Sequence, residues 1–365
     1  MKAYRIVKFD PEWPEAVDFF EDYESEFLKC INKYNKNLNF TSSGKTSLYM
    51  ILKAFNIKEG DEVILPCYCC GSLLIPIKML KIKPIAADID MQDLNISKNS
   101  IKQLISSRTK AVIVPSLYGN PANLTEIIEE VGGQIKIIDD AAQAFDAKLN
   151  DRFVGTFGNA GFWSFGVGKQ ISSSGGSFFW ADNTNDFNLK RSSFISQMIQ
   201  HYVFLFTRVN LKKNQNKKLA IKLLSKLNQL INSNKKVLER SMGKIDANVG
   251  FQLIKSFEDS NVKRKKLYEE ISLALADKPY IRLIKNIRGE SSPNKIVICI
   301  DEASRYQAIC KILQRKAVFY STGYELICAE AIQKCHNAKK IKNSIIEIPL
   351  SLREKEYLLE TIGLF

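Results

Sequence analysis

Apolar and polar positions along the first half of the chain predict strands and helices in alternation. Apolar runs typical of buried strands occur at 61–66, 83–90, 110–119 and 134–140. Apolar residues at helical spacing lie at 46–56, 75–81, 98–107 and 121–131. Because strands that alternate with helices form a parallel sheet, we expect an α/β domain with a mostly parallel central sheet and helices on both faces.

The pattern changes after residue 184. Residues 185–244 carry basic helical sequence without strands, and residues 245–365 show a different rhythm. That last part predicts helices near 248–275 and 303–315 and strands at 281–284, 295–301 and 345–350. We expect a large domain at 1–184, a linking segment at 185–244 and a smaller α+β domain at 245–365.

The composition is that of a globular protein of 365 residues, with 45% hydrophobic and 25% charged residues, long enough for two domains. No apolar stretch reaches the ~18 residues of a membrane span, and the N-terminal residues carry acids and a proline instead of a signal peptide. The eight cysteines are scattered, which favours reduced thiols and a cytoplasmic protein. No histidine lies near the run CYCC at 67–70, so no metal site is expected there.

Most of the net charge of +14 belongs to one segment, because residues 190–240 contain twelve Lys or Arg and the single acid Glu239. Residues 216–231 form a predicted amphipathic helix with leucines on one face and lysines on the other. The pattern favours a helix docked on its own dimer. Contact of 201–236 with an anionic membrane surface stays an alternative, whereas no motif indicates nucleic acid.

The stretch FTSSGKTSL at 40–48 resembles the end of a phosphate-binding P-loop. A Walker A loop needs a glycine five residues before Gly44, where this chain has Asn39, so half of the motif is missing. The segment still opens a helix, and the first N–H groups of a helix bind a phosphate well. A P-loop NTPase that uses Lys45 is therefore the weaker alternative, and a phosphate cradle of another kind is the stronger one.

Three segments together suit pyridoxal phosphate (PLP). A PLP site needs a lysine for the Schiff base, a carboxylate beside the ring nitrogen and an anion cradle. IIDDAAQAF at 137–145 places Asp140 at a strand end, with Gln143 one turn later. FWSFGVGKQISSSGG at 162–176 is a predicted Gly/Ser-rich loop that holds Ser164 and Lys169. FTSSGKTSL supplies the cradle.

These segments, in this order, resemble the DegT/DnrJ/EryC1/StrS family of PLP-dependent sugar aminotransferases, which has the aspartate-aminotransferase fold (fold type I). SSGKTSLYMILKAFNIKEGDEVILPCY resembles the family's SGTxAL…GxGDEVIxPxf, and KPIAADID with VPSLYGNPAN resembles PvfvDid and hlyG-xpa. IDDAAQAF and VGTFGNAGFWSFGVGK resemble EDAAQA and vGsfGdaacfSF…K. The likeness covers 35–183 well and 245–365 more loosely.

The resemblance implies a role for each matching residue. Lys169 corresponds to the Schiff-base lysine and proton carrier, Asp140 to the partner of the ring nitrogen, and Gln143 to a residue near the ring hydroxyl. Ser164 and the backbone of Gly44 and Lys45, at the helix start, correspond to the groups that bind the phosphate.

The chain departs from the family pattern at three places. Cys70 occupies the position of an aromatic residue that often stacks on the ring, and the run after the lysine is one residue short. Glu239 and Ser241 stand where the family tends to have an asparagine, which reaches the partner subunit's phosphate, and an arginine. A carboxylate would repel that phosphate.

The resemblance implies a homodimeric aminotransferase that moves an amino group, with glutamate as donor, to a nucleotide-linked keto-sugar during surface polysaccharide or glycoconjugate assembly. Family members that act as dehydratases replace the lysine with histidine, so the retained Lys169 favours transamination. Besides the NTPase, a catalytically weak relative that serves as a scaffold or membrane-associated partner stays an alternative because of Cys70, Glu239 and the basic segment.

Overall fold

The computed structural model describes residues 24–131, 133, 135–166, 168–182, 189–191, 194, 197–201, 238–328 and 332–365. The predicted amphipathic helix at 216–231 lies outside these residues, as does the apolar run 201–206 except for His201. Within the described ranges, no helix combines the length and apolarity that a membrane span needs.

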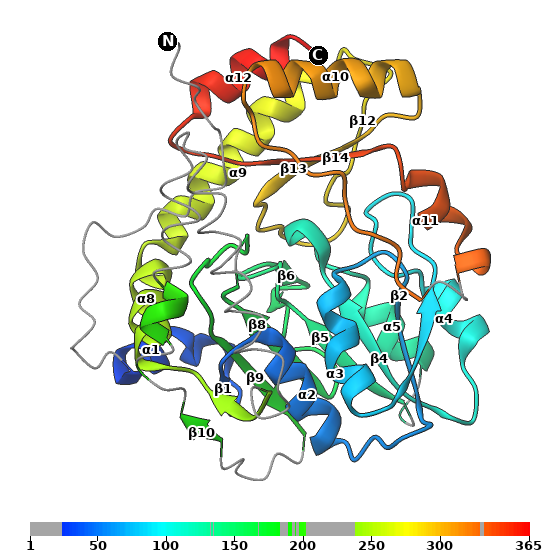
Figure 1. The fold of residues 1–365 in the computed structure, drawn as a ribbon, viewed down its shortest axis with the longest axis vertical. Coiled ribbons are helices and arrows are strands. Elements are labelled where there is room, and N and C mark those ends of the chain that lie inside the picture. Colours follow the sequence, from blue (N-terminus) through cyan, green and yellow to red (C-terminus); the bar gives the residue numbers. More distant parts are fainter. Residues whose placement is uncertain are drawn as a thin grey trace.

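A seven-stranded sheet forms the larger part of the molecule (Figure 1). Its strands, in spatial order, are β1 (Asn39–Thr41), β9 (Ser177–Ala181), β8 (Ala160–Ser164), β5 (Lys136–Asp140), β4 (Thr109–Pro115), β2 (Glu62–Pro66) and β3 (Lys83–Ala87). The pairs from β8 to β3 are parallel, whereas β9 is antiparallel to both β8 and β1. The mostly parallel sheet expected from the sequence is thereby confirmed.

Helices cover both faces of this sheet. One face packs on α2 (Gly44–Ala54) and α3 (Leu74–Met79). The other packs on α1 (Glu24–Ile31), α4 (Lys98–Leu104), α5 (Leu124–Val131) and α8 (Lys244–Lys255). Alternate residues of each central strand enter opposite cores, as with Val63 and Ile64 of β2. Burial on both faces explains why these strands are apolar runs rather than alternating ones.

A smaller C-terminal domain packs beyond the strand ends (Figure 1). Its antiparallel sheet has the order β12 (Arg282–Leu283), β13 (Lys295–Cys299) and β14 (Ile345–Pro349). Three helices cover one face of that sheet, namely α9 (Phe257–Ala274), α10 (Ala303–Arg315) and α12 (Lys355–Gly363). Further described elements are α11 (His336–Ile341) and two short strand pairs, β6 (Lys148–Leu149) with β7 (Arg152–Phe153) and β10 (Lys190–Arg191) with β11 (Arg240–Ser241).

The second face of the small sheet closes over the ends of the large one. Val297, Cys299 and Ile345 share a buried cluster with Tyr68, which follows β2, and with Tyr118, which follows β4. Residues between the two sheets are therefore held by both. This junction lies at the carboxyl ends of the parallel strands, where open α/β sheets bind their ligands.

Two predicted strands end earlier than the sequence pattern suggests. β3 ends at Ala87 instead of residue 90, and β4 ends at Pro115 instead of residue 119. Beyond β4 the backbone turns, and Tyr118 takes a positive φ of 60°. Gly119 follows with φ +87°, where a Cβ atom would lie 1.9 Å from the carbonyl oxygen of Ser292. The close approach of the small domain thus requires glycine.

Candidate active site

Asp140 and Lys169 lie within electrostatic range of each other at the carboxyl edge of the large sheet. Asp140 is the last residue of β5, and its Oδ1 accepts a hydrogen bond from the Ala142 N–H at 2.9 Å. Burial raises the pKa of the Asp140 carboxyl to about 6, while the Lys169 charge acts to lower it. Burial lowers the pKa of the Lys169 amine, and the nearby Cys70 and Asp140 oppose that change. A buried amine, a carboxylate and a thiol therefore share one site.

The segment that holds Lys169 begins as a strand. The sequence pattern placed 162–176 in one loop, but Phe162, Trp163 and Ser164 end strand β8, and the loop starts at Phe165. The strand forms because Phe162 and Trp163 alternate between the two cores of the large sheet. Ser164 is consequently fixed by the sheet and not by a turn.

Both domains hold the Lys169 loop in place. Gln170 donates from Nε2 to the backbone carbonyl of Gln143 and to that of Ser292, the latter at 2.8 Å. Asn294 donates from Nδ2 to the carbonyl oxygen of Gly168 at 3.1 Å. Residues 292 and 294 belong to the small domain, so its position fixes the loop on either side of the lysine.

The first residue of helix α2 packs against Ser164. Ser43 caps the helix and accepts from the Thr46 N–H, while the first N–H groups of a helix have no acceptor within it. A Cβ atom on Gly44 would lie 3.1 Å from both Cβ and Oγ of Ser164. The first two residues of α2, Gly44 and Lys45, thus begin the helix beside Ser164, as the predicted anion cradle requires.

Gln143 lies within reach of the same site. It is buried, and its Oε1 accepts a hydrogen bond from the hydroxyl group of Tyr324 at 2.9 Å. Because the amide oxygen is bound, the amide nitrogen is left to donate to another group. The backbone carbonyl of Gln143 accepts a hydrogen bond from Gln170, so Gln143 is tied to the loop that holds Lys169.

The sequence analysis missed a buried polar cluster from the small domain. Glu347 of β14 is 2% exposed and accepts hydrogen bonds from Tyr118, Ser321 and Lys295 at 2.7, 2.7 and 2.6 Å. Glu347 raises the pKa of Lys169 and Lys295 lowers it, so both lie within electrostatic range of that amine. The available signal was a charged residue inside each of the apolar strands IIEIP and KIVIC.

Two residues that depart from the family pattern, Cys70 and Glu239, contact neighbouring side chains. Cys70 Sγ lies 3.0 Å from the Ser72 hydroxyl group, and Cys70 is within electrostatic range of Lys169. The carboxylate of Glu239 is half exposed and pairs with Lys53 Nζ at 3.5 Å. That pairing offsets part of the negative charge of Glu239.

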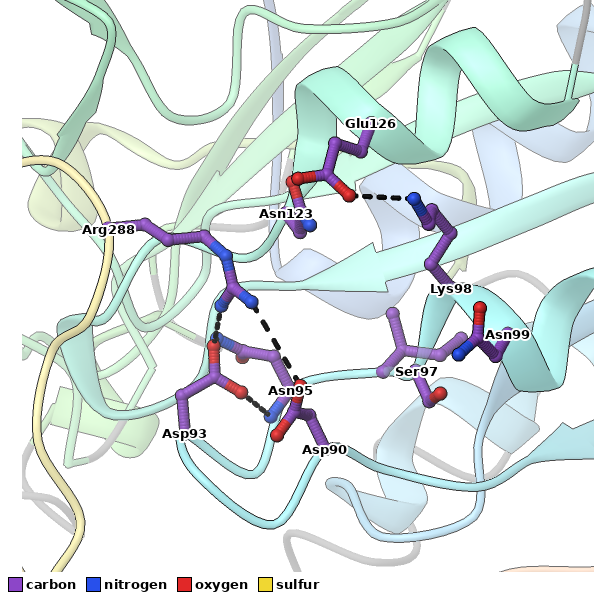
Figure 2. Close-up of a pocket in the computed structure, with 10 residues that line it drawn as sticks. Asp90, Asp93, Asn95, Ser97, Lys98, Asn99, Asn123, Glu126 and Arg288 are labelled. Carbon is purple, nitrogen blue, oxygen red and sulfur yellow. Dashed lines mark hydrogen bonds and ion pairs between the residues drawn. The ribbon is translucent and has the colours of Figure 1, made fainter.

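A separate cavity of about 340 Å³ opens beside α4 and α5, and none of the predicted cofactor residues lines it (Figure 2). Arg288 reaches into it and pairs with Asp93, and Lys98 pairs with Glu126 at 2.7 Å. The lining holds the acids Asp90, Asp93 and Glu126 against two cations, Lys98 and Arg288, a formal sum of −1.

Curated relatives match about half of this chain, and the chain spans about half the length, or less, of those relatives. GDP-perosamine synthase of Escherichia coli O157:H7 is 31% identical over 177 residues, which are 48% of either chain. UDP-N-acetyl-3-dehydro-alpha-D-glucosamine 3-aminotransferase of Acidithiobacillus ferrooxidans is 33% identical over 135 residues, 37% of either chain.

The fold itself has solved counterparts. GDP-4-keto-6-deoxy-D-mannose-3-dehydratase of E. coli, solved with bound hydrated PLP, superposes with a TM-score of 0.72 at 19% identity. The match covers 98% of this chain and all of that one. The expected fold, that of PLP-dependent transferases of fold type I, is confirmed by this likeness.

The sequence profile of the DegT/DnrJ/EryC1/StrS aminotransferase family matches residues 11–356, nearly the whole chain. The resemblance noted in the sequence is confirmed by this match. The chain belongs to the DegT/DnrJ/EryC1/StrS aminotransferase family.

Proposed function

We propose that this protein is a PLP-dependent aminotransferase that transfers an amino group to a keto group on a nucleotide-linked sugar. The observation that carries the proposal is that Lys169 and Asp140 come within electrostatic range of each other at the carboxyl edge of the sheet. That pair of residues stands beside the cradle of Gly44 and Ser164.

The residues present fit PLP. Gly44 approaches Ser164 so closely that a side chain would fill the cradle, which leaves room there for a phosphate and for the free N–H groups of α2. Asp140 is suited to hold the protonated ring nitrogen, and Gln143 has a free amide donor for the ring hydroxyl. Cys70 supplies a polarisable thiol where a packing surface for the ring is expected.

PLP, when bound, supplies an aldehyde that exchanges amino groups and a conjugated ring that accepts electrons. The protein moves the protons. The lowered pKa of Lys169 increases the neutral fraction of its amine, which can then take a proton from the carbon that loses it and return it later. The Asp140 carboxylate, with a pKa of about 6, is ionised at neutral pH and stabilises positive charge opposite it.

The substrate class rests on the relatives. Two of them are named for the nucleotide sugars GDP-perosamine and UDP-N-acetyl-3-dehydro-alpha-D-glucosamine. Dehydratases also occur among the similar proteins, and the retained Lys169 favours transamination here. We extend the proposal to glutamate as amino donor, to a homodimer and to surface polysaccharide or glycoconjugate assembly in the cytoplasm.

The first test is the absorption spectrum of the purified protein with added PLP, followed by borohydride reduction and peptide mapping. We expect visible absorption and a cofactor-modified peptide that carries Lys169. Lys169→Ala should lose that modification and all amino transfer, whereas Lys311→Ala, an exposed lysine of α10, should change neither.

The same variants separate the alternatives. If the protein were an NTPase, the Lys169→Ala variant would hydrolyse nucleotide as well as the unaltered protein does. Its hydrolysis would depend on Lys45 instead. A scaffold would bind its partner without taking up PLP at all. Modification of a lysine other than Lys169 would show that the proposed chemistry is wrong.

A further inference from the structure

Three potential metal ligands meet between the two sheets, outside the proposed active site. The Sγ atoms of Cys67 and Cys335 and a carboxylate oxygen of Asp88 all lie within 4.8 Å of one another. We propose that these three residues bind a thiophilic divalent cation of the zinc class, which ties the small domain to the edge of the large sheet.

Tertiary structure alone brings these residues together. β2 and β3 are parallel neighbours, and Pro66 of β2 pairs with Ala87 of β3. Cys67 and Asp88 are the next residues of each strand, and the Cys67 N–H donates to the Ala87 carbonyl at 2.8 Å. Cys335 comes from the small domain, directly before α11. The expectation of no metal site at CYCC rested on the lack of a histidine nearby in the sequence. Asp88 and Cys335 are distant from CYCC in the sequence.

The Asp88 carboxylate is held in a fixed orientation. Its Oδ1 accepts from the N–H groups of Ile89 and Ala338 at 2.9 and 3.0 Å, and its Oδ2 accepts from that of Asn337 at 2.9 Å. A carboxylate offers about four lone-pair sites, so about one remains, on Oδ2. Hydrogen bonds that orient a ligand in this way are typical of metal sites.

Backbone N–H groups, and no ion pair among the described residues, offset the negative charge of Asp88. Among the described residues, no ion pair includes Asp88. Both thiols are buried and free of disulfides. Two thiolates and a carboxylate suit zinc and its soft neighbours, whereas Mg²⁺ and Ca²⁺ prefer oxygen ligands. Binding of such a cation displaces the thiol protons to solvent.

The fourth ligand is within reach of the same junction. The Ala86 carbonyl oxygen lies 4.0 Å from Cys335 Sγ, and a water molecule is the other choice. The neighbouring thiols are engaged elsewhere, because Cys69 donates to the Pro66 carbonyl and Cys70 contacts Ser72. The site therefore consists of Cys67, Asp88 and Cys335 and is distinct from the thiol that faces Lys169.

The test measures zinc binding to the reduced, PLP-loaded protein by equilibrium dialysis after chelator treatment. We expect one tightly bound Zn²⁺ per chain, lost in Cys67→Ser and in Cys335→Ser. Cys310→Ser, a half-buried thiol of α10, is the matched control and should bind zinc as the unaltered chain does. Bound zinc should raise Tm by about 2 °C at saturating metal.

A second measurement does not depend on the folding of any variant. Alkylation of the unaltered protein over hours, long enough for local opening to expose buried thiols, should be slower at Cys67 and Cys335 with Zn²⁺ than without it and equal at Cys310. Absence of stoichiometric zinc, or equal zinc in Cys67→Ser, would overturn the proposal. A disulfide between Cys67 and Cys335 in the untreated protein would also overturn it, because the pair would then be a redox dithiol.

Discussion

The hydroxyl group of Tyr324 donates a hydrogen bond to Gln143 Oε1 across 2.9 Å, from the small domain to the end of β5. The Tyr324 ring also stacks on that of Tyr118, with centroids 6.1 Å apart and planes at 21°. A residue of the small domain thereby selects the orientation of an amide in the proposed cofactor site. Closure of the small domain and the geometry of that site are thus linked.

Tyr324→Phe should weaken PLP binding or turnover by about fivefold, because one neutral hydrogen bond contributes ~1 kcal/mol. The stacked ring is kept, so the fold should be unchanged. Titration with PLP and steady-state kinetics measure the effect, and Tyr280→Phe in the same domain serves as the control. A purely structural tyrosine would instead lower Tm and leave the PLP affinity intact.

Glu347→Gln should destabilise the protein by about 3–5 kcal/mol, because it leaves the Lys295 ammonium poorly compensated in a largely buried place. Lys295→Met combined with Glu347→Gln should recover most of that loss. Denaturant unfolding of the two single variants and the double variant gives the coupling energy. Additive effects of the two changes would contradict a direct interaction.

The pH profile of amino transfer should fall on the acid side near pH 6. Burial raises the pKa of Asp140 to about 6, and protonation below that value removes the negative charge opposite the cofactor ring. Asp140→Asn should lower kcat by at least about 100-fold at neutral pH, by analogy with the loss of a preorganised charged group. The Asp140→Asn variant should also lack the fall in activity near pH 6. Measurement of kcat/KM as a function of pH would show this.

Asp139, one residue before Asp140, should make the free energy of unfolding depend on pH. Burial raises its pKa to about 8, and its Oδ1 has no hydrogen-bond partner among the described residues. Because the folded pKa exceeds the unfolded value, this group's stabilisation is full below pH ~4 and is lost as the pH rises to about 8.

The slope from that single group is about 1.4 kcal/mol per pH unit within this window. Asp139→Asn keeps an acceptor for the N–H of Phe157 and should remove the slope, which unfolding midpoints between pH 5 and 8 would measure. An unchanged slope would assign the pH dependence to other carboxyls.

Gly44→Ala should reduce PLP affinity by about tenfold or more, because the new Cβ lies 3.1 Å from Ser164 and enters the proposed phosphate cradle. Gly71→Ala is the matched control, since a Cβ there meets nothing within 4 Å. Equilibrium dialysis with PLP measures both variants. Equal affinity in the two would place the phosphate elsewhere.

The sequence by itself determined the order of the elements and supplied the residues of the proposed cofactor site. Periodic apolar positions are local, so the strands and helices of the large sheet could be located within a few residues. The order and spacing of the motifs proposed Lys169, Asp140 and Gly44, because motifs are local in the sequence. Strand ends were predicted less accurately, since β3 stops at Ala87 and not at residue 90.

Only the tertiary structure decided which residues meet between the two sheets. Tyr324 with Gln143, Glu347 with Lys295, and Cys67 with Cys335 are pairs whose members come from different strands or loops. No periodicity encodes such pairs, because each depends on how the small sheet closes over the ends of the large one. The shape of that closure, rather than any local pattern, determines the charges around Lys169.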